Sequence, residues 1–184
     1  MSVLTRISQY YFIKEYKMNK LNDLKGTAIA KTEDYKIIRK KWNSMHSRIN
    51  TSKHYTNVTV CDEWYTLSNF YYWMIQQDGE LTWDLDKDIL GGNEYSPSTC
   101  ILVPNHINQL FRKSTNSLGK GVVKNRNGFQ AQIFHNNKRE PLGTYKTPEQ
   151  AAAVAESRRK QIIADYSVQY SNYPVLSEAL KKHF

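Results

Sequence analysis

Apolar residues recur at helical spacing in the segment 33–49. They are separated by three or four positions, which is the spacing of one face of an α-helix. The members of this stripe are Tyr35, Ile38, Trp42, Met45 and Ile49. Basic residues, Arg39, Lys40, Lys41 and Arg48, lie on the other sides, so we predict an amphipathic helix that ends at Asn50 and Thr51.

The middle of the chain changes to shorter and more varied patterns. Residues 56–60 favour a short strand, and the aromatic run that ends at Ile75 favours a second helix packed in a core. Residues 82–103 predict a β-hairpin, because two strand-like runs flank a loop rich in glycine and polar residues. Pro104 then begins a helix, and the small polar residues 112–119 are typical of a linker.

Strict alternation appears in the segment 128–134. One predicted strand face carries Phe129, Ala131 and Ile133, and the opposite face carries Gln130, Gln132 and Phe134. Thr147 then opens an alanine-rich helix. We therefore predict a three-stranded antiparallel sheet with one helix packed across one face, leaving the other face free, polar and basic.

These patterns together predict an α+β fold. It consists of an N-terminal helical region with a strand–loop–strand–helix unit, linked to the small sheet. We divide the chain into an N-terminal arm 1–32, a first domain 33–111, a linker 112–119, a sheet domain 120–166 and a C-terminal helix within 167–184.

The charge of the chain favours a polyanionic partner. Its 184 residues carry a formal net charge of +9, and the pI is about 9.4. Residues 1–50 have a net charge of +7, residues 51–119 of −4 and residues 120–166 of +5. Basic flanks suit phosphates and an acidic centre suits a metal ion, which is the distribution expected of a nuclease.

Other classes of protein are disfavoured by the composition. Cys61 and Cys100 form no CxxC pair, so there is no signature of a structural zinc site, and we expect buried free thiols. No apolar run approaches the length of a membrane span, and no signal peptide is evident. We therefore expect a cytoplasmic protein without membrane contact.

Three carboxylates alternate along the first strand of the predicted hairpin: Asp84, Asp86 and Asp88. Alternation places them on one face of a strand, where they repel one another unless a cation or basic groups compensate. Two interpretations stay open at this point, a solvated edge strand or a cation site.

The segment LDKD, the loop with Gly91 and Gly92, the run YSPSTCILVP and the following helix resemble the ββα-metal unit of HNH endonucleases. The resemblance implies that Asp86 and Asn108 hold one divalent ion, Mg²⁺ or Mn²⁺. It also implies that Lys87 occupies the place of the general-base histidine. Thr99 stands where an orienting asparagine is expected.

Replacement of the histidine by Lys87 leaves the proton acceptor open. Lys87 can stabilise charge on the phosphate while another group takes the proton. His106 or His54 can replace the missing base. Alternatively, the domain keeps DNA binding and has lost cleavage.

The run KREPLGTYKTPEQAAAVA, after the alternating strand, resembles the APETALA (ethylene-response-factor) type of DNA-binding domain. The resemblance implies that the helix-free face of the sheet lies in the DNA major groove. Base contacts are expected from Gln130, Gln132, Phe134, Arg126 and Arg139, and phosphate contacts from Lys124, Lys138 and Lys146. Pro141 departs from the family, because an aromatic residue is expected there.

In this order, the two units resemble a phage-encoded, homing-like HNH endonuclease. The resemblance implies metal-dependent nicking or cleavage of double-stranded DNA by a monomer in the cytoplasm of an infected bacterial host. Two alternatives stay open: a catalytically inactive DNA-binding or regulatory protein, and a phage protein that blocks a host factor.

Overall fold

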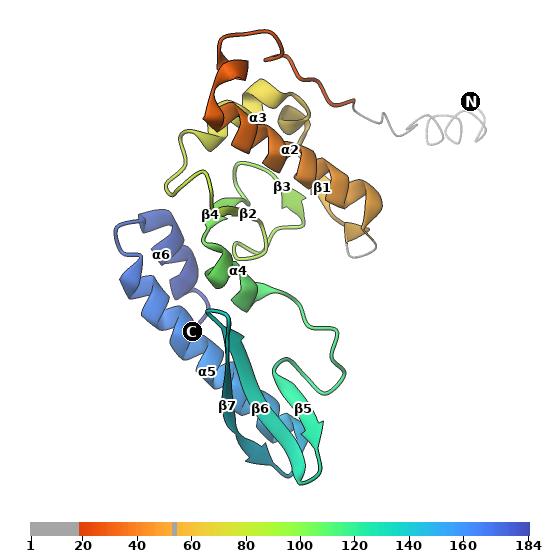
Figure 1. Ribbon diagram of the computed structural model, residues 1–184, viewed down its shortest axis with the longest axis vertical. Helices are drawn as coiled ribbons and strands as arrows, with labels where there is room; N and C mark the ends of the chain where they lie inside the picture. The colour runs from red at the N-terminus through yellow and green to blue at the C-terminus, as the bar shows by residue number, and fades with distance from the viewer. Residues whose placement is uncertain (1–18, 53–54) are drawn as a thin grey trace, which may run out of the picture.

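The computed structural model describes residues 19–52 and 55–184, and Figure 1 shows them as an α+β arrangement. An N-terminal helical region lies beside a short hairpin, and a three-stranded antiparallel sheet with a long helix follows. The predicted α+β class is therefore confirmed. None of the helices in the described part of the chain is long and apolar enough to cross a membrane.

The first predicted helix is present as α2 (Glu33–Thr51), after a short 3₁₀ turn, η1 (Ile29–Lys31). Thr32 caps it by accepting a hydrogen bond from the Tyr35 N–H at 3.2 Å. Its buried residues are Tyr35, Ile38, Trp42, Met45 and His46. The apolar stripe thus faces the core, as its spacing predicts.

The second predicted helix comprises η3 (Asp62–Tyr65) and α3 (Leu67–Met74). The strand before it, β1 (Thr59–Val60), is shorter than the predicted 56–60 and pairs in parallel with β3 (Glu94–Tyr95). Trp64 is buried at the centre of this region, where its carbonyl accepts a hydrogen bond from Trp42 Nε1 at 2.6 Å. Aromatic packing therefore fixes α2 against η3 and α3.

The predicted hairpin consists of β2 (Asp84–Asp86) and β4 (Ile101–Val103), paired antiparallel. The loop between them contains β3, which joins it to the N-terminal region. The helix predicted after Pro104 is α4 (Asn105–Phe111). Strand, loop, strand and helix therefore occur in the predicted order.

The sheet of the second unit has the order β5 (Val122–Asn125), β6 (Gly128–His135) and β7 (Lys138–Tyr145). Asn136 and Asn137 form the two-residue turn between β6 and β7, both with positive φ, as a primed hairpin turn requires. Helix α5 (Pro148–Gln169) follows and packs on all three strands. The predicted three-stranded sheet with one helix is confirmed.

Helix α5 also connects the two units. Its second half packs against α4 and the last helix, α6 (Pro174–Lys181), and α6 in turn contacts β4 (Figure 1). The shared cluster includes Ile101, Val103, Ile107, Ile162, Ile163, Tyr166, Leu176 and Leu180. Residues 112–119 form no helix or strand and connect the hairpin unit to the sheet unit along the chain. The shared cluster joins the same two units by packing.

Candidate functional site

A polar cavity of about 360 Å³ lies where α2, β2, β3 and α4 meet. We call it the hairpin cavity. It is lined by Arg48, Tyr55, Asp84, Leu85, Asp86, Asp88, Tyr95, Asn105, Asn108, Phe111 and Arg112. The fold therefore gathers residues that lie far apart in the sequence, including the predicted pair Asp86 and Asn108.

Asp84 is the carboxylate that contacts the helix of this unit. Its Oδ2 accepts hydrogen bonds from Asn105 Nδ2 at 2.8 Å and from Asn108 Nδ2 at 3.0 Å. The amide oxygen of Asn105 is engaged as well, because it accepts from Gln109 Nε2 at 2.7 Å. Asp84 therefore orients Asn108. The residue predicted to act with Asn108 was Asp86, two positions further along β2.

Asp86 lines the hairpin cavity and also accepts hydrogen bonds from the backbone of its own loop. It is 6% exposed, and its Oδ1 accepts the backbone N–H groups of Asp88 at 3.0 Å and Ile89 at 2.9 Å. Burial raises the pKa of the Asp86 carboxyl, the two N–H groups oppose that rise, and the charge of Asp88 adds to it. A cation in the cavity would relieve the burial of this charge.

Lys87 does not line the hairpin cavity. It is 4% exposed, and its Nζ contacts Asp88 Oδ1 at 2.8 Å and the Gly92 carbonyl at 3.4 Å. The rings of Tyr55 and Tyr95 lie 5.8 and 5.7 Å from the ammonium. In this position Lys87 holds the hairpin loop and does not reach into the cavity.

Thr99 and His106 also lie outside the cavity lining. Thr99 Oγ1 donates to the Glu94 carbonyl at 2.6 Å and accepts from the Ser96 N–H at 3.1 Å, so it organises the loop. His106 packs against Tyr166 and Tyr170, and burial followed by the nearby His135 lowers its pKa. The alternative base His54 lies outside the described residues.

The oxygen donors around the cavity include three carboxylates, Asp84, Asp86 and Asp88, and the amides of Asn105 and Asn108. One oxygen of Asp88 is engaged by Lys87, and the amide oxygen of Asn105 is engaged by Gln109. No group of three or more His, Cys, Asp or Glu positioned to hold a metal occurs within residues 19–52 and 55–184. A closed all-protein metal cage is therefore not present there. The donor set instead fits a Mg²⁺-type ion, which binds one or two carboxylates and completes its shell with water and phosphate oxygens.

The sheet presents a second polar surface, and its register decides which residues belong to it. Gln130 pairs with Thr144, and Phe134 pairs with Arg139, so these four lie on the face away from α5. Phe134 is 56% exposed there. We call this surface the sheet face; Gln132 shares it by alternation, and the predicted residues Arg126 and Lys146 lie exposed at its ends.

Two predicted members of the sheet face lie on the other side. Lys124 pairs with Phe129, and Lys138 pairs with His135, which contacts Tyr166 of α5. Paired residues in antiparallel strands project to the same side, so both lysines project from the helix-covered side. The strand position on the sheet face next to Lys124 is occupied by Val123, which pairs with Gln130.

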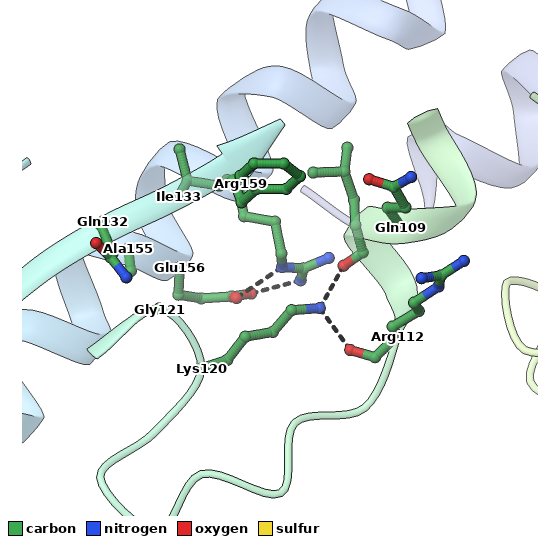
Figure 2. A pocket seen from close by; sticks show the side chains of 11 residues that line it. Gln109, Arg112, Lys120, Gly121, Gln132, Ile133, Ala155, Glu156 and Arg159 are labelled. Carbon is green, nitrogen blue, oxygen red and sulfur yellow. Dashed lines mark hydrogen bonds and ion pairs between the residues drawn. The ribbon is translucent and has the colours of Figure 1, made fainter. Parts of the chain in front are cut away.

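A further cavity, of about 400 Å³, lies between α4, the edge of β6 and α5 (Figure 2). At its rim Lys120 Nζ donates to the carbonyls of Leu110 at 2.6 Å and Arg112 at 2.7 Å. Burial lowers the pKa of Lys120, and Arg159 lowers it further. Lys120 thus caps the carbonyl end of α4 and fixes the end of the linker.

Several lining residues of the hairpin cavity were not predicted from the sequence: Arg48, Tyr55, Tyr95 and Asn105. Arg48 has the same pattern position as the other basic residues of α2, so only packing distinguishes it. Asn105 precedes Asn108 by three positions on α4, and that spacing is the one signal in the sequence that could have found it.

No protein-family model, curated protein or solved structure matches this chain.

Proposed function

We propose that the protein is a metal-dependent endonuclease of the HNH-like type that binds double-stranded DNA and cleaves phosphodiester bonds at the hairpin cavity. The observation that carries the proposal is the cavity itself. It places two carboxylates, Asp84 and Asp86, beside the amide of Asn108 and the guanidinium of Arg48. Oxygen donors for a cation and a cationic donor for a phosphate are the parts that phosphodiester chemistry requires.

Each side chain has a role that its contacts support. Asp86 and Asn108 would hold the ion, and Asp84 keeps Asn108 in place through its 3.0 Å hydrogen bond. Arg48 orients a phosphate oxygen from the α2 side. When bound, a Mg²⁺-type ion supplies positive charge to the phosphate and to the leaving oxygen.

Sequence selection belongs to the sheet face in this proposal. Gln130, Gln132 and Arg139 carry the groups that form paired hydrogen bonds with base edges in the major groove. The core shared between α4, α5 and α6 fixes this face relative to the hairpin cavity. Cleavage at a constant separation from the recognised sequence, by a monomer, follows from that rigidity.

A second candidate is DNA binding without cleavage. It is favoured by one observation: the hairpin cavity is lined neither by Lys87, which stands in the place of the general base, nor by the alternative base His106. The phenol of Tyr95 is a poor substitute, because burial raises its pKa.

Nicking of supercoiled and phage-genomic DNA with Mg²⁺ or Mn²⁺ distinguishes the two candidates. The test variant is Asp86→Asn, because the amide oxygen of asparagine can still accept the two N–H groups that Asp86 holds. Asp165→Asn, on the exposed side of α5, is the matched control. We expect metal-dependent nicking by the parent and the control, and loss of about 100-fold or more in Asp86→Asn.

A gel shift on the same DNA completes the experiment. Binding retained by all three proteins, with cleavage absent in Asp86→Asn alone, supports the endonuclease. Binding without cleavage by the parent in either metal establishes the second candidate. Equal nicking by Asp86→Asn and the parent would show that the hairpin cavity is not the site.

A further inference from the structure

A second cavity, of about 410 Å³, runs along α2 and adjoins the hairpin cavity. We call it the α2 groove. It is lined by Ile37, Lys40, Lys41, Ser44, Met45, Arg48, Thr82, Asp84, Leu85 and Tyr95. Arg48, Asp84, Leu85 and Tyr95 line both cavities, so the two form a continuous depression.

The charges of the α2 groove are arranged along its length. Lys40, Lys41 and Arg48 contribute three positive charges, and Asp84 is the carboxylate among its lining residues. Asp84 lies where the groove meets the hairpin cavity. The groove is therefore basic along α2 and becomes acidic where the proposed ion binds.

We propose that the α2 groove holds the sugar–phosphate backbone of the DNA strand that enters the hairpin cavity. This inference rests on the proposed function, and it assigns the phosphate contacts to a helix outside the sheet unit. Lys40 and Arg48 are its phosphate ligands, and the strand follows α2 toward Asp84.

The spacing of the two ligands suits an extended polyanion. Arg48 lies eight positions after Lys40 in α2, which is about 12 Å along the helix axis. One strand of duplex DNA carries a phosphate every ~3.4 Å along its axis, so that span covers more than one phosphate. Both side chains are exposed, so they can meet a ligand without displacing the core.

Lys41 has a different role. Its Nζ donates to the carbonyl of Trp83, and burial lowers its pKa, whereas Asp84 raises it. Lys41 therefore fixes the segment before β2 as the far wall of the groove. Arg48 lies at the junction of the two cavities, which Tyr95 also lines.

The matched control comes from the same helix. Lys36 and Arg39 are exposed on α2 and line neither cavity. The pair Lys36→Ala with Arg39→Ala removes the same charge as the pair Lys40→Ala with Arg48→Ala. Far-UV circular dichroism checks that both double variants keep the fold.

Affinity for a short DNA duplex is measured by fluorescence anisotropy across a salt series, with the full chain. Each phosphate contact contributes about 0.9 to the slope of log affinity against log salt. We expect the slope of the groove variant to fall by about 2 and that of the control variant to stay at the parent's value. Cleavage by the groove variant should fall further than its affinity, because Arg48 also lines the hairpin cavity.

Equal slopes for the two double variants would overturn the groove assignment. The proposed function would survive that result as long as the parent still binds and nicks DNA. A parent that shows no salt-dependent DNA binding would remove the proposed function itself, and the groove assignment with it.

Discussion

The hairpin cavity and the sheet face are two polar surfaces built in different ways. The sheet face comes from one stretch of chain between Val123 and Thr144, and strand register alone decides its members. The hairpin cavity combines segments from Arg48 to Arg112, brought together by the packing of α2, β2, β3 and α4. Local pattern is therefore a good guide to the first surface and a poor guide to the second.

The two surfaces also differ in chemistry. Arg139 is the positively charged residue that the strands contribute to the sheet face. Its neighbours on this face are amide side chains, Thr144 and the exposed ring of Phe134. The hairpin cavity is acidic and opens into the basic α2 groove. Under the proposed function, the sheet selects the sequence, and α2 supplies much of the electrostatic affinity.

The largest effect is expected from breaking the local construction of the sheet. Gly128 has φ +138°, and a Cβ there would lie 2.3 Å from the carbonyl oxygen of Tyr145. Gly128→Ala should lower the free energy of unfolding by about 3 kcal/mol, because strain and overlap add. Urea denaturation measures the loss, and selective DNA binding should fall with it.

Gly91→Ala is the control for that prediction. Gly91 has φ +81°, and a Cβ there meets nothing within 4 Å. Gly91→Ala should lower the free energy of unfolding by about 1 kcal/mol, because only conformational strain contributes. Equal losses in the two variants would mean that the contact with Tyr145 does not constrain the sheet.

A smaller effect is expected from breaking the long-range construction of the hairpin cavity. Asp84→Ala removes the acceptor shared by Asn105 and Asn108. We expect a loss of about 2 kcal/mol in the free energy of unfolding and weaker metal-stimulated nicking, with unchanged sequence preference. Full nicking activity in this variant would contradict a positioning role for Asp84.

The register of the sheet is tested by two neighbouring cations. Arg139 lies on the sheet face with Phe134, whereas Lys138 pairs with His135 on the side of α5. Arg139→Ala should reduce the preference for a specific DNA site by about tenfold, or ~1.4 kcal/mol. Lys138→Ala should leave that preference intact in competition gel shifts, and equal losses would refute the assignment of faces.

The smallest effect concerns the joint between the two units. Burial lowers the pKa of His106, followed by the charge of His135; burial likewise lowers the pKa of His135, with Arg158 adding to the shift and Glu140 opposing it. The unfolded chain therefore binds protons below its ordinary histidine pKa of 6.5 that the folded chain excludes. The stability these groups contribute is present above that pKa and is lost as pH falls through the folded values.

Urea denaturation at about pH 7.5 and about pH 5.5 measures this dependence. Replacing both residues, His106→Gln with His135→Gln, should flatten the difference between the two conditions. A double variant with the parent's full pH dependence would place the responsible groups elsewhere, for example at the buried His46, whose pKa is also lowered by burial.

Much of the fold is readable from local pattern. The stripe of α2, the alternation of β6 and the cap at Thr147 each predict an element that the structure contains. Lys124 and Lys138 were predicted on the sheet face, but both project from the side that α5 covers. Their strands carry no clear alternation of their own, so only pairing with β6 decides their side.

The candidate site is less readable. Asp86 and Asn108 were predicted, and both line the hairpin cavity, but the hydrogen-bond partners of each could not be predicted. Asn108 binds Asp84, and Lys87 turns to Asp88 within the loop. A carboxylate on a strand has several donors within reach, and the choice among them depends on backbone positions set by the core.

The sequence by itself determined the secondary structure, the order of the two units, the basic charge and the alternating faces of β6, because these depend on neighbours a few residues apart. Only the tertiary structure decided that α5 joins the units through a shared core and that Arg48 meets Asp84 at a cavity. The physical reason is that such contacts arise from burying apolar faces of distant segments together. The burial of apolar surface is non-directional. It therefore brings polar groups of distant segments together without a pattern in the local sequence that would predict the contact.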